Sequence, residues 1–195
     1  GGPYEGAMKL KEEGLIDHVV FSAHANGGEI RKMCESKLFE GVLLGYNIFN
    51  HSNRSEGIQA ARENNMGVAV MNPLGGGMVP AAAEKLDYLV EREDETVIQA
   101  ALRFVISDPG VTLALAGMGT IEHVEENAKV GDRMQQPDPA TVERLKEQYG
   151  EFGEAYCTAC KYCLPCPVDI NIPNMLACLN RHKVGLEKEA KGFYE

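Results

Sequence analysis

The sequence lacks the features that mark membrane proteins and nucleic-acid-binding proteins. Its longest apolar runs, such as Leu113–Ala116, are far shorter than the roughly 20 residues of a membrane-spanning helix. No basic run offsets the net charge of −10, which would repel phosphate backbones and anionic lipids. The N-terminus shows neither the basic start nor the apolar stretch of a signal peptide. These absences predict a soluble, cytoplasmic protein that binds neither nucleic acid nor membranes.

Cysteine is scarce outside one short segment. Four of the six cysteines lie between positions 157 and 166, and only Cys34 and Cys178 lie elsewhere. A secreted disulfide scaffold would need cysteines distributed over the chain. The clustering therefore favours metal binding in a reducing compartment.

The region from Leu15 to about Lys129 alternates short apolar runs with amphipathic segments, which is the pattern of βα units around a parallel sheet. The expected strands are His18–Ser22, Gly41–Tyr46, Gly67–Met71 and Thr112–Ala116. The expected helices are Ala7–Glu13, Gly28–Ser36, Ser55–Asn65, Asp94–Ser107, Thr120–Val130 and one from Asp138. The strand sequences do not alternate strictly, as expected of strands covered on both faces. Four such units are too few to close a barrel, and periodicity also permits a small doubly wound sheet.

The composition changes near residue 150. Residues 1–150 carry the α/β pattern, whereas residues 151–195 combine cysteine, turn residues and a mostly polar helical pattern from Asn174 onward. A chain of 195 residues can bury one sizeable core and a small appendage. We therefore expect an α/β domain followed by a small α-helical, cysteine-rich tail.

The strongest motif is Cys157-x2-Cys160-x2-Cys163-x2-Cys166-Pro167. Four thiolates in one loop suit a cuboidal 4Fe-4S cluster, and the bacterial cluster motif also ends in Cys-Pro. A zinc ion usually takes ligands from two Cys-x2-Cys pairs separated by a longer connection. The motif therefore favours iron-sulfur over zinc, disulfides or free thiols.

One spacing departs from the bacterial cluster motif. That motif has three residues before its last cysteine, whereas Leu164 and Pro165 alone precede Cys166. Cys166 is the expected fourth ligand, but it could instead belong to a second cluster. Cys178 is an alternative fourth ligand, although its apolar neighbours favour a packing role. By the same reasoning Cys34, on a helix with Met33, is expected in the core or at the surface.

Several stretches, taken in order, resemble strands five to eight of aldo-keto reductases. They are residues 13–22, 46–47, 67–77, 116–120 and 125–127. The tail Cys157–Pro167 is similar to the subgroup of that family with ferredoxin-type extensions. The resemblance implies the C-terminal half of a (β/α)8 TIM barrel, with NAD or NADP bound in extended form across the carboxyl ends of the strands.

The resemblance also implies which residues contact the cofactor. Ser22 would hold the carboxamide, and the loop Asn72–Gly77 would run beside the pyrophosphate, where glycines permit close approach. Thr120 would cap a helix whose N-terminal N–H groups attract phosphate, and Glu126 and Asn127 match residues that contact adenine. The full set is Ser22, Asn72, Pro73, Leu74, Gly75, Gly117, Met118, Gly119, Thr120, His123, Glu126 and Asn127.

Some positions depart from the family pattern. The family usually stacks an aromatic ring on the nicotinamide at the position of Met71 and has an amide side chain at that of Leu43. His123 falls where NADP-preferring members tend to carry Arg, so the choice between NAD and NADP stays open. The family's catalytic residues belong to the first four strands. We therefore expect no catalytic residue in this sequence and a chain truncated at both ends.

The leading hypothesis is a fragment of an aldo-keto-reductase-like oxidoreductase with an iron-sulfur extension. In the intact family member, hydride would pass between the nicotinamide and a small carbonyl or alcohol substrate. One alternative is an electron-transfer module that serves a redox partner protein. Another is a structural half-barrel that self-associates through open sheet edges, which natural folds normally pair or cover.

Overall fold

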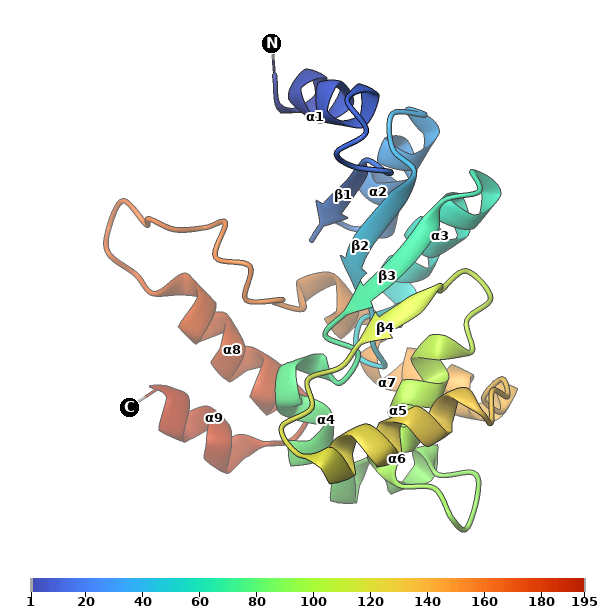
Figure 1. Ribbon diagram of the computed structural model, residues 1–195. Helices are drawn as coiled ribbons and strands as arrows, with labels where there is room; N and C mark the ends of the chain where they lie inside the picture. Colours follow the sequence, from blue (N-terminus) through green and yellow to red (C-terminus); the bar gives the residue numbers. More distant parts are fainter. Residues whose placement is uncertain (1, 195) are drawn as a thin grey trace.

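The computed structural model describes residues 2–194, without the side chains of Glu154 and Phe193, and confirms the α/β architecture. Its four parallel strands form one sheet in sequence order (Figure 1). They are β1 (Val20–Ala23), β2 (Gly41–Gly45), β3 (Gly67–Met71) and β4 (Leu113–Leu115). All four expected strands are confirmed, with small differences at their ends. Within the described residues, no helix is long and apolar enough to cross a bilayer.

Three helices cover one face of the sheet (Figure 1). They are α2 (Gly27–Glu35), α3 (His51–Glu63) and α5 (Val97–Ile106). Their apolar stripes pack against the strand residues that point toward them, and the least exposed members of this core include Ile30, Leu44, Ile58, Val70 and Val105. A Cβ atom on Gly57 of α3 would lie 2.8 Å from the Ile30 side chain, so the absence of a side chain there lets α2 approach α3 closely.

The opposite face of the sheet is open. Val20 is 57% exposed on β1, and Leu113 and Leu115 are 46% and 54% exposed on β4. The expectation that both faces are covered is therefore wrong for the described residues. Successive side chains of a strand point to opposite faces, so these apolar residues lie on the face away from the helices.

Two helices begin at residues other than those expected. The α3 helix starts earlier, at His51, and its N-cap Asn50 makes no side-chain bond to the helix. The chain before it is held in a turn, in which Asn50 Oδ1 accepts from Asn47 N at 2.9 Å and Asn47 Oδ1 accepts from Phe49 N at 3.0 Å. The α5 helix starts at Val97, later than the expected Asp94, because its capping residue is Thr96. Thr96 Oγ1 accepts from Gln99 N at 3.2 Å, and Gln99 Oε1 accepts from Thr96 N at 2.9 Å.

The remaining helices surround this core. They are α1 (Pro3–Glu12), α4 (Met78–Ala81), α6 (Ile121–Gly131), α7 (Pro139–Ala155), α8 (Ile172–Lys183) and α9 (Glu187–Tyr194). The α4 helix and the short 3-10 turns between β3 and α5 have no counterpart among the expected elements. The helical pattern after Asn174 is split into α8 and α9 by Gly185, whose φ is +79°. Val184 and Leu186, on either side of that turn, are buried in the core.

A buried ion-pair group joins α5 to the segment before it. The Arg103 side chain is 2% exposed, and its Nε lies 2.7 Å from Glu95 Oε1. Its Nη1 lies 3.1 Å from Glu91 Oε2. Taking either carboxylate partner away would leave a buried charge, and taking the cation away would leave two acids without their partner.

Arg103→Met should therefore lower the free energy of unfolding by about 3 kcal/mol, because the Glu91 and Glu95 carboxylates would lose their cation. Arg31→Met is the matched control, because Arg31 pairs with exposed Glu56 and Glu63 and should cost less than about 1 kcal/mol. Urea denaturation of both variants measures the difference. Equal losses would contradict the structural role assigned to Arg103.

Candidate functional site

The carboxyl ends of the four strands lie at one edge of the sheet, because all four are parallel. Met71 pairs in register with Leu115, so the segments that follow β3 and β4 begin side by side at this edge. These segments contain residues 72–77 and 117–120, the two loops expected beside the pyrophosphate and the adenosine. The structure therefore brings the two loops together, and their contacts with a cofactor stay a prediction.

The positions expected around the nicotinamide share the open face of the sheet. Ser22 pairs in register with Leu43, and Leu43 pairs with Ala69. Met71 lies two positions beyond Ala69, so it points to the same face. Ser22 belongs to β1, whereas α6 follows β4 at the other side of the sheet. A ligand that contacts both Ser22 and α6 would have to cross the width of the sheet, as an extended dinucleotide can.

The loop after β3 has a backbone held in a particular shape. Asn72, Gly75, Gly76 and Gly77 all have positive φ, which glycine adopts without strain. Asn72 O accepts from Asn47 Nδ2 at 3.0 Å and from Gly75 N at 2.9 Å. These bonds close the loop into a compact turn.

The loop after β4 is exposed and leads directly into α6. Thr120 Oγ1 accepts from His123 N at 3.3 Å, which confirms that Thr120 caps this helix. His123 Nδ1 accepts from Gly119 N at 3.3 Å. A Cβ atom on Gly117 or Gly119 would meet no described atom within 4 Å. The space above these glycines is therefore open to a ligand.

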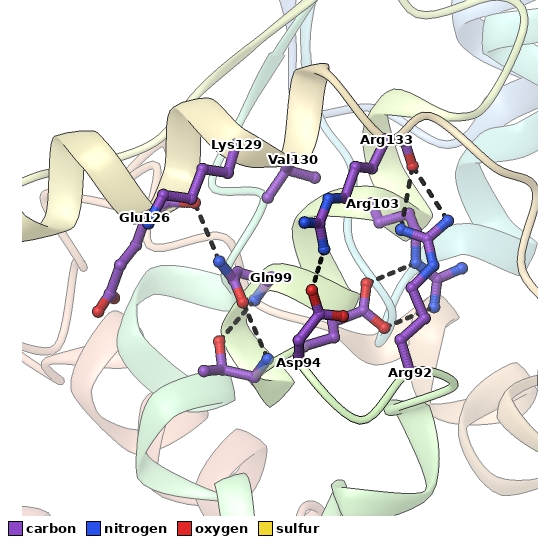
Figure 2. A pocket seen from close by; sticks show the side chains of 10 residues that line it. Arg92, Asp94, Gln99, Arg103, Glu126, Lys129, Val130 and Arg133 are labelled. Atoms are coloured by element: carbon purple, nitrogen blue, oxygen red, sulfur yellow. Dashed lines mark hydrogen bonds and ion pairs between the residues drawn. The ribbon is translucent and has the colours of Figure 1, made fainter.

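A cavity of about 420 Å³ lies between the start of α5 and the second half of α6 (Figure 2). Of the residues expected to bind cofactor, it contains Glu126, whose carbonyl oxygen accepts from Gln99 Nε2 at 3.1 Å. Arg92, Lys129 and Arg133 also line the cavity and were not among the expected residues. Lys129 follows Glu126 by three positions on α6, so the sequence could have identified it, whereas Arg133 lies beyond the end of that helix. Arg92 lies in the loop before α5, where no helical spacing relates it to Glu126.

His24 lies just beyond β1, at the same edge as the two loops. Its Nδ1 is 2.8 Å from Thr158 Oγ1. Burial, together with the charge of Arg54, lowers the pKa of His24, which favours the neutral imidazole. Arg54 is buried and donates from Nη2 to His24 O at 2.8 Å, while its Nε and Nη1 have no hydrogen-bond partner among the described residues. The buried Arg54 side chain thus holds the backbone just after β1 through its bond to His24 O.

The four cysteines of the tail are free thiols in one extended loop. Cys157, Cys160 and Cys166 are half-buried and Cys163 is exposed. Among residues 2–194, no group of three or more His, Cys, Asp or Glu side chains is close enough to hold a metal ion. The structure therefore does not bring the four expected ligands together. Thiols in one loop are the donor type of an iron-sulfur site, and the cluster itself stays a prediction.

The two other cysteines occupy different surroundings. Cys34 is 1% exposed in the core between α2 and the sheet, and burial raises the pKa of its thiol. Of the two positions left open for Cys34, core or surface, the structure shows the core. Cys178 is half-buried on α8, beside Leu179 and His182.

Comparison with known proteins identifies relatives of one kind. A model of the Aldo/keto reductase family matches residues 6–148. An uncharacterized oxidoreductase of Schizosaccharomyces pombe is 27% identical over 122 residues, which cover 62% of this chain and 39% of that protein.

Solved structures show the same fold. The holo form of an aldo-keto reductase from Bacillus halodurans matches with a TM-score of 0.58 and 20% identity, over 73% of this chain and 54% of that chain. An aldo-keto reductase from Klebsiella pneumoniae in complex with NADPH matches with a TM-score of 0.57 and 20% identity, over 76% of this chain and 55% of that chain. The present chain spans just over half the length of these two structures. Because the family model matches well over half of the sequence, the chain belongs to the aldo/keto reductase family.

Proposed function

We propose that this chain binds a nicotinamide cofactor along the carboxyl edge of its sheet, as part of an aldo-keto-reductase-like oxidoreductase. The whole protein would move a hydride between the nicotinamide and a small carbonyl or alcohol. The observation that carries the proposal is the pairing of Met71 with Leu115, which places the loops after β3 and β4 side by side. The Klebsiella pneumoniae relative binds NADPH, which makes NADPH the first cofactor to test.

In this proposal, different segments of the chain contact different parts of the cofactor. Ser22 orients the carboxamide at β1, and the turn at residues 72–77 runs beside the pyrophosphate, where glycines permit close approach. The loop at residues 117–120 and the start of α6 receive the adenosine end, because Thr120 caps a helix whose N-terminus favours negative charge. Glu126 and Asn127 contact the adenine.

We also propose that residues 1–150 correspond to strands five to eight of a (β/α)8 barrel. The open sheet face supports this, because its exposed apolar residues at Val20, Leu113 and Leu115 would point into a barrel interior. In a complete barrel, further strands would pair with β1 and β4. A second copy of the chain could serve the same purpose by self-association.

For the tail, residues 151–195, we propose an iron-sulfur site. Cys157, Cys160, Cys163 and Cys166 would ligate a 4Fe-4S cluster, and such a cluster supplies one-electron transfer when bound. Free thiols support a reducing, cytoplasmic location. An electron-transfer module without catalysis of its own is the second candidate, favoured by the same four cysteines.

The first prediction concerns the loop after β4. The double variant Gly117→Ala/Gly119→Ala should bind NADPH about tenfold more weakly, because the added methyl groups fill space that the ligand approaches. The fold should be unaffected, since neither Cβ atom would meet a described atom within 4 Å. Isothermal titration calorimetry measures the affinity. Gly131→Ala, at the far end of α6 with equally open space, is the matched control and should bind NADPH normally. Equal affinity in both variants would contradict the proposed site.

The second prediction concerns the tail. Anaerobically prepared protein should contain about four iron atoms and four sulfides per chain. Cys160→Ser should abolish the visible charge-transfer absorption, whereas Cys34→Ser should retain it, because Cys34 is buried in the core. Loss of the absorption in Cys178→Ser but not in Cys166→Ser would show that Cys178 is the fourth ligand. One zinc ion without iron or sulfide would contradict the cluster.

A further inference from the structure

The segment that begins the cysteine tail lies across the carboxyl ends of three consecutive strands (Figure 1). Tyr156 OH donates to Gly75 O at 3.3 Å, in the loop after β3. The Thr158 methyl group lies 3.9 Å from the position that a Cβ atom would take on Gly45, the last residue of β2. Thr158 Oγ1 is 2.8 Å from His24 Nδ1, just after β1. One short stretch of chain therefore contacts the ends of β1, β2 and β3.

Aromatic packing reinforces these contacts on both sides. The Tyr156 ring stacks on Phe49 at 6.3 Å between centroids and meets Phe152 edge-on at 5.5 Å. The Tyr162 ring meets His24 edge-on at 5.5 Å. Aromatic contacts as well as hydrogen bonds therefore hold this segment against the α/β domain.

The backbone of Cys157, the first cysteine of the motif, is held by a residue of α8. Asn180 of α8 is 4% exposed. Its Oδ1 accepts from Cys157 N at 3.2 Å, and its Nδ2 donates to Cys157 O at 2.8 Å. Both backbone polar groups of Cys157 are therefore occupied by one buried side chain. Tyr156 and Thr158, which flank Cys157, bond to the sheet edge, so a movement of this cysteine would displace both of their contacts.

We propose that Tyr156 and Thr158 are positioning residues that couple metal binding by the cysteine segment to NADPH binding at the sheet edge. The inference rests on the proposed function of the two sites. Thr158 stands between Cys157 and Cys160 and holds His24, two positions beyond Ser22. Tyr156 holds Gly75, in the loop assigned to the pyrophosphate. The nicotinamide end and the pyrophosphate part of the assigned cofactor path are thus tied to the cysteine segment.

Coupling follows from the ordering that metal binding imposes. Ligation by Cys157 and Cys160 would restrict the residues between and beside them. The hydrogen bonds of Tyr156 and Thr158 would transmit this restriction to the loop after β3 and to His24. A cofactor that binds an already ordered edge loses less conformational entropy on binding. NADPH should therefore bind more tightly to the cluster-loaded chain than to the metal-free chain.

The test measures NADPH affinity by anaerobic calorimetry, for the chain reconstituted with iron and sulfide and for the chain stripped of metal by a chelator. Wild-type protein should bind NADPH at least about fivefold more tightly when loaded, in the usual range of coupling between two sites. Thr158→Val and Tyr156→Phe each remove one hydroxyl and should reduce this ratio to below about twofold. Thr158→Ser keeps the hydroxyl and should restore the wild-type ratio.

Tyr88→Phe is the matched control, because Tyr88 OH donates to Gln148 Oε1 at 3.0 Å, a residue of α7 outside the cysteine segment. This variant should keep the wild-type ratio. Equal NADPH affinity in loaded and metal-free wild-type protein, with both sites functional, would overturn the inference and leave the proposed function intact. Absence of NADPH binding in both forms would contradict the proposed function itself, and the inference with it.

Discussion

The parallel pairing of four strands in sequence order is the constraint on which the rest of the structure depends. It directs every strand toward the same edge, so residues far apart in the chain meet there because of the topology. The helices pack on one face and keep the strands in register, while glycines such as Gly57 allow α2 and α3 to pack closely. The loops at the carboxyl edge contribute little to this packing, so their side chains can differ without disrupting the fold.

Two kinds of local order give the carboxyl edge its shape. The loop after β3 is held by hydrogen bonds to Asn72 O and by backbone conformations that glycine adopts readily. The loop after β4 remains open and ends in the cap of α6. The cysteine tail returns to the same edge through Tyr156 and Thr158, which joins the part of the chain that matches the aldo/keto reductase family to the segment that follows it.

The sequence predicted the strands well because their aliphatic runs are local signals, and the predicted span Gly67–Met71 agrees with β3 at both ends. It predicted helix ends less well because capping depends on particular side-chain bonds, as at Thr96. The open sheet face was missed because aliphatic strands look alike whether one face or two are covered.

At the candidate site, too, the sequence predicted contacts between near neighbours in the chain and missed contacts between distant residues. Thr120 was identified as a helix cap because a cap and its helix are neighbours in sequence. The contacts of the tail were not predictable, because His24 and Thr158 are separated by 134 positions, and Gly75 and Tyr156 by 81. No periodic pattern relates such pairs, and only the folded topology brings them together.

Hydrogen–deuterium exchange with and without NADPH tests the central claim most directly, since it reports where a ligand orders the backbone. The account predicts slower exchange in peptides that cover residues 72–77 and 117–123, with unchanged exchange in α7. Protection confined to other regions, or no protection at saturating NADPH, would contradict the assignment of the carboxyl edge as the cofactor site.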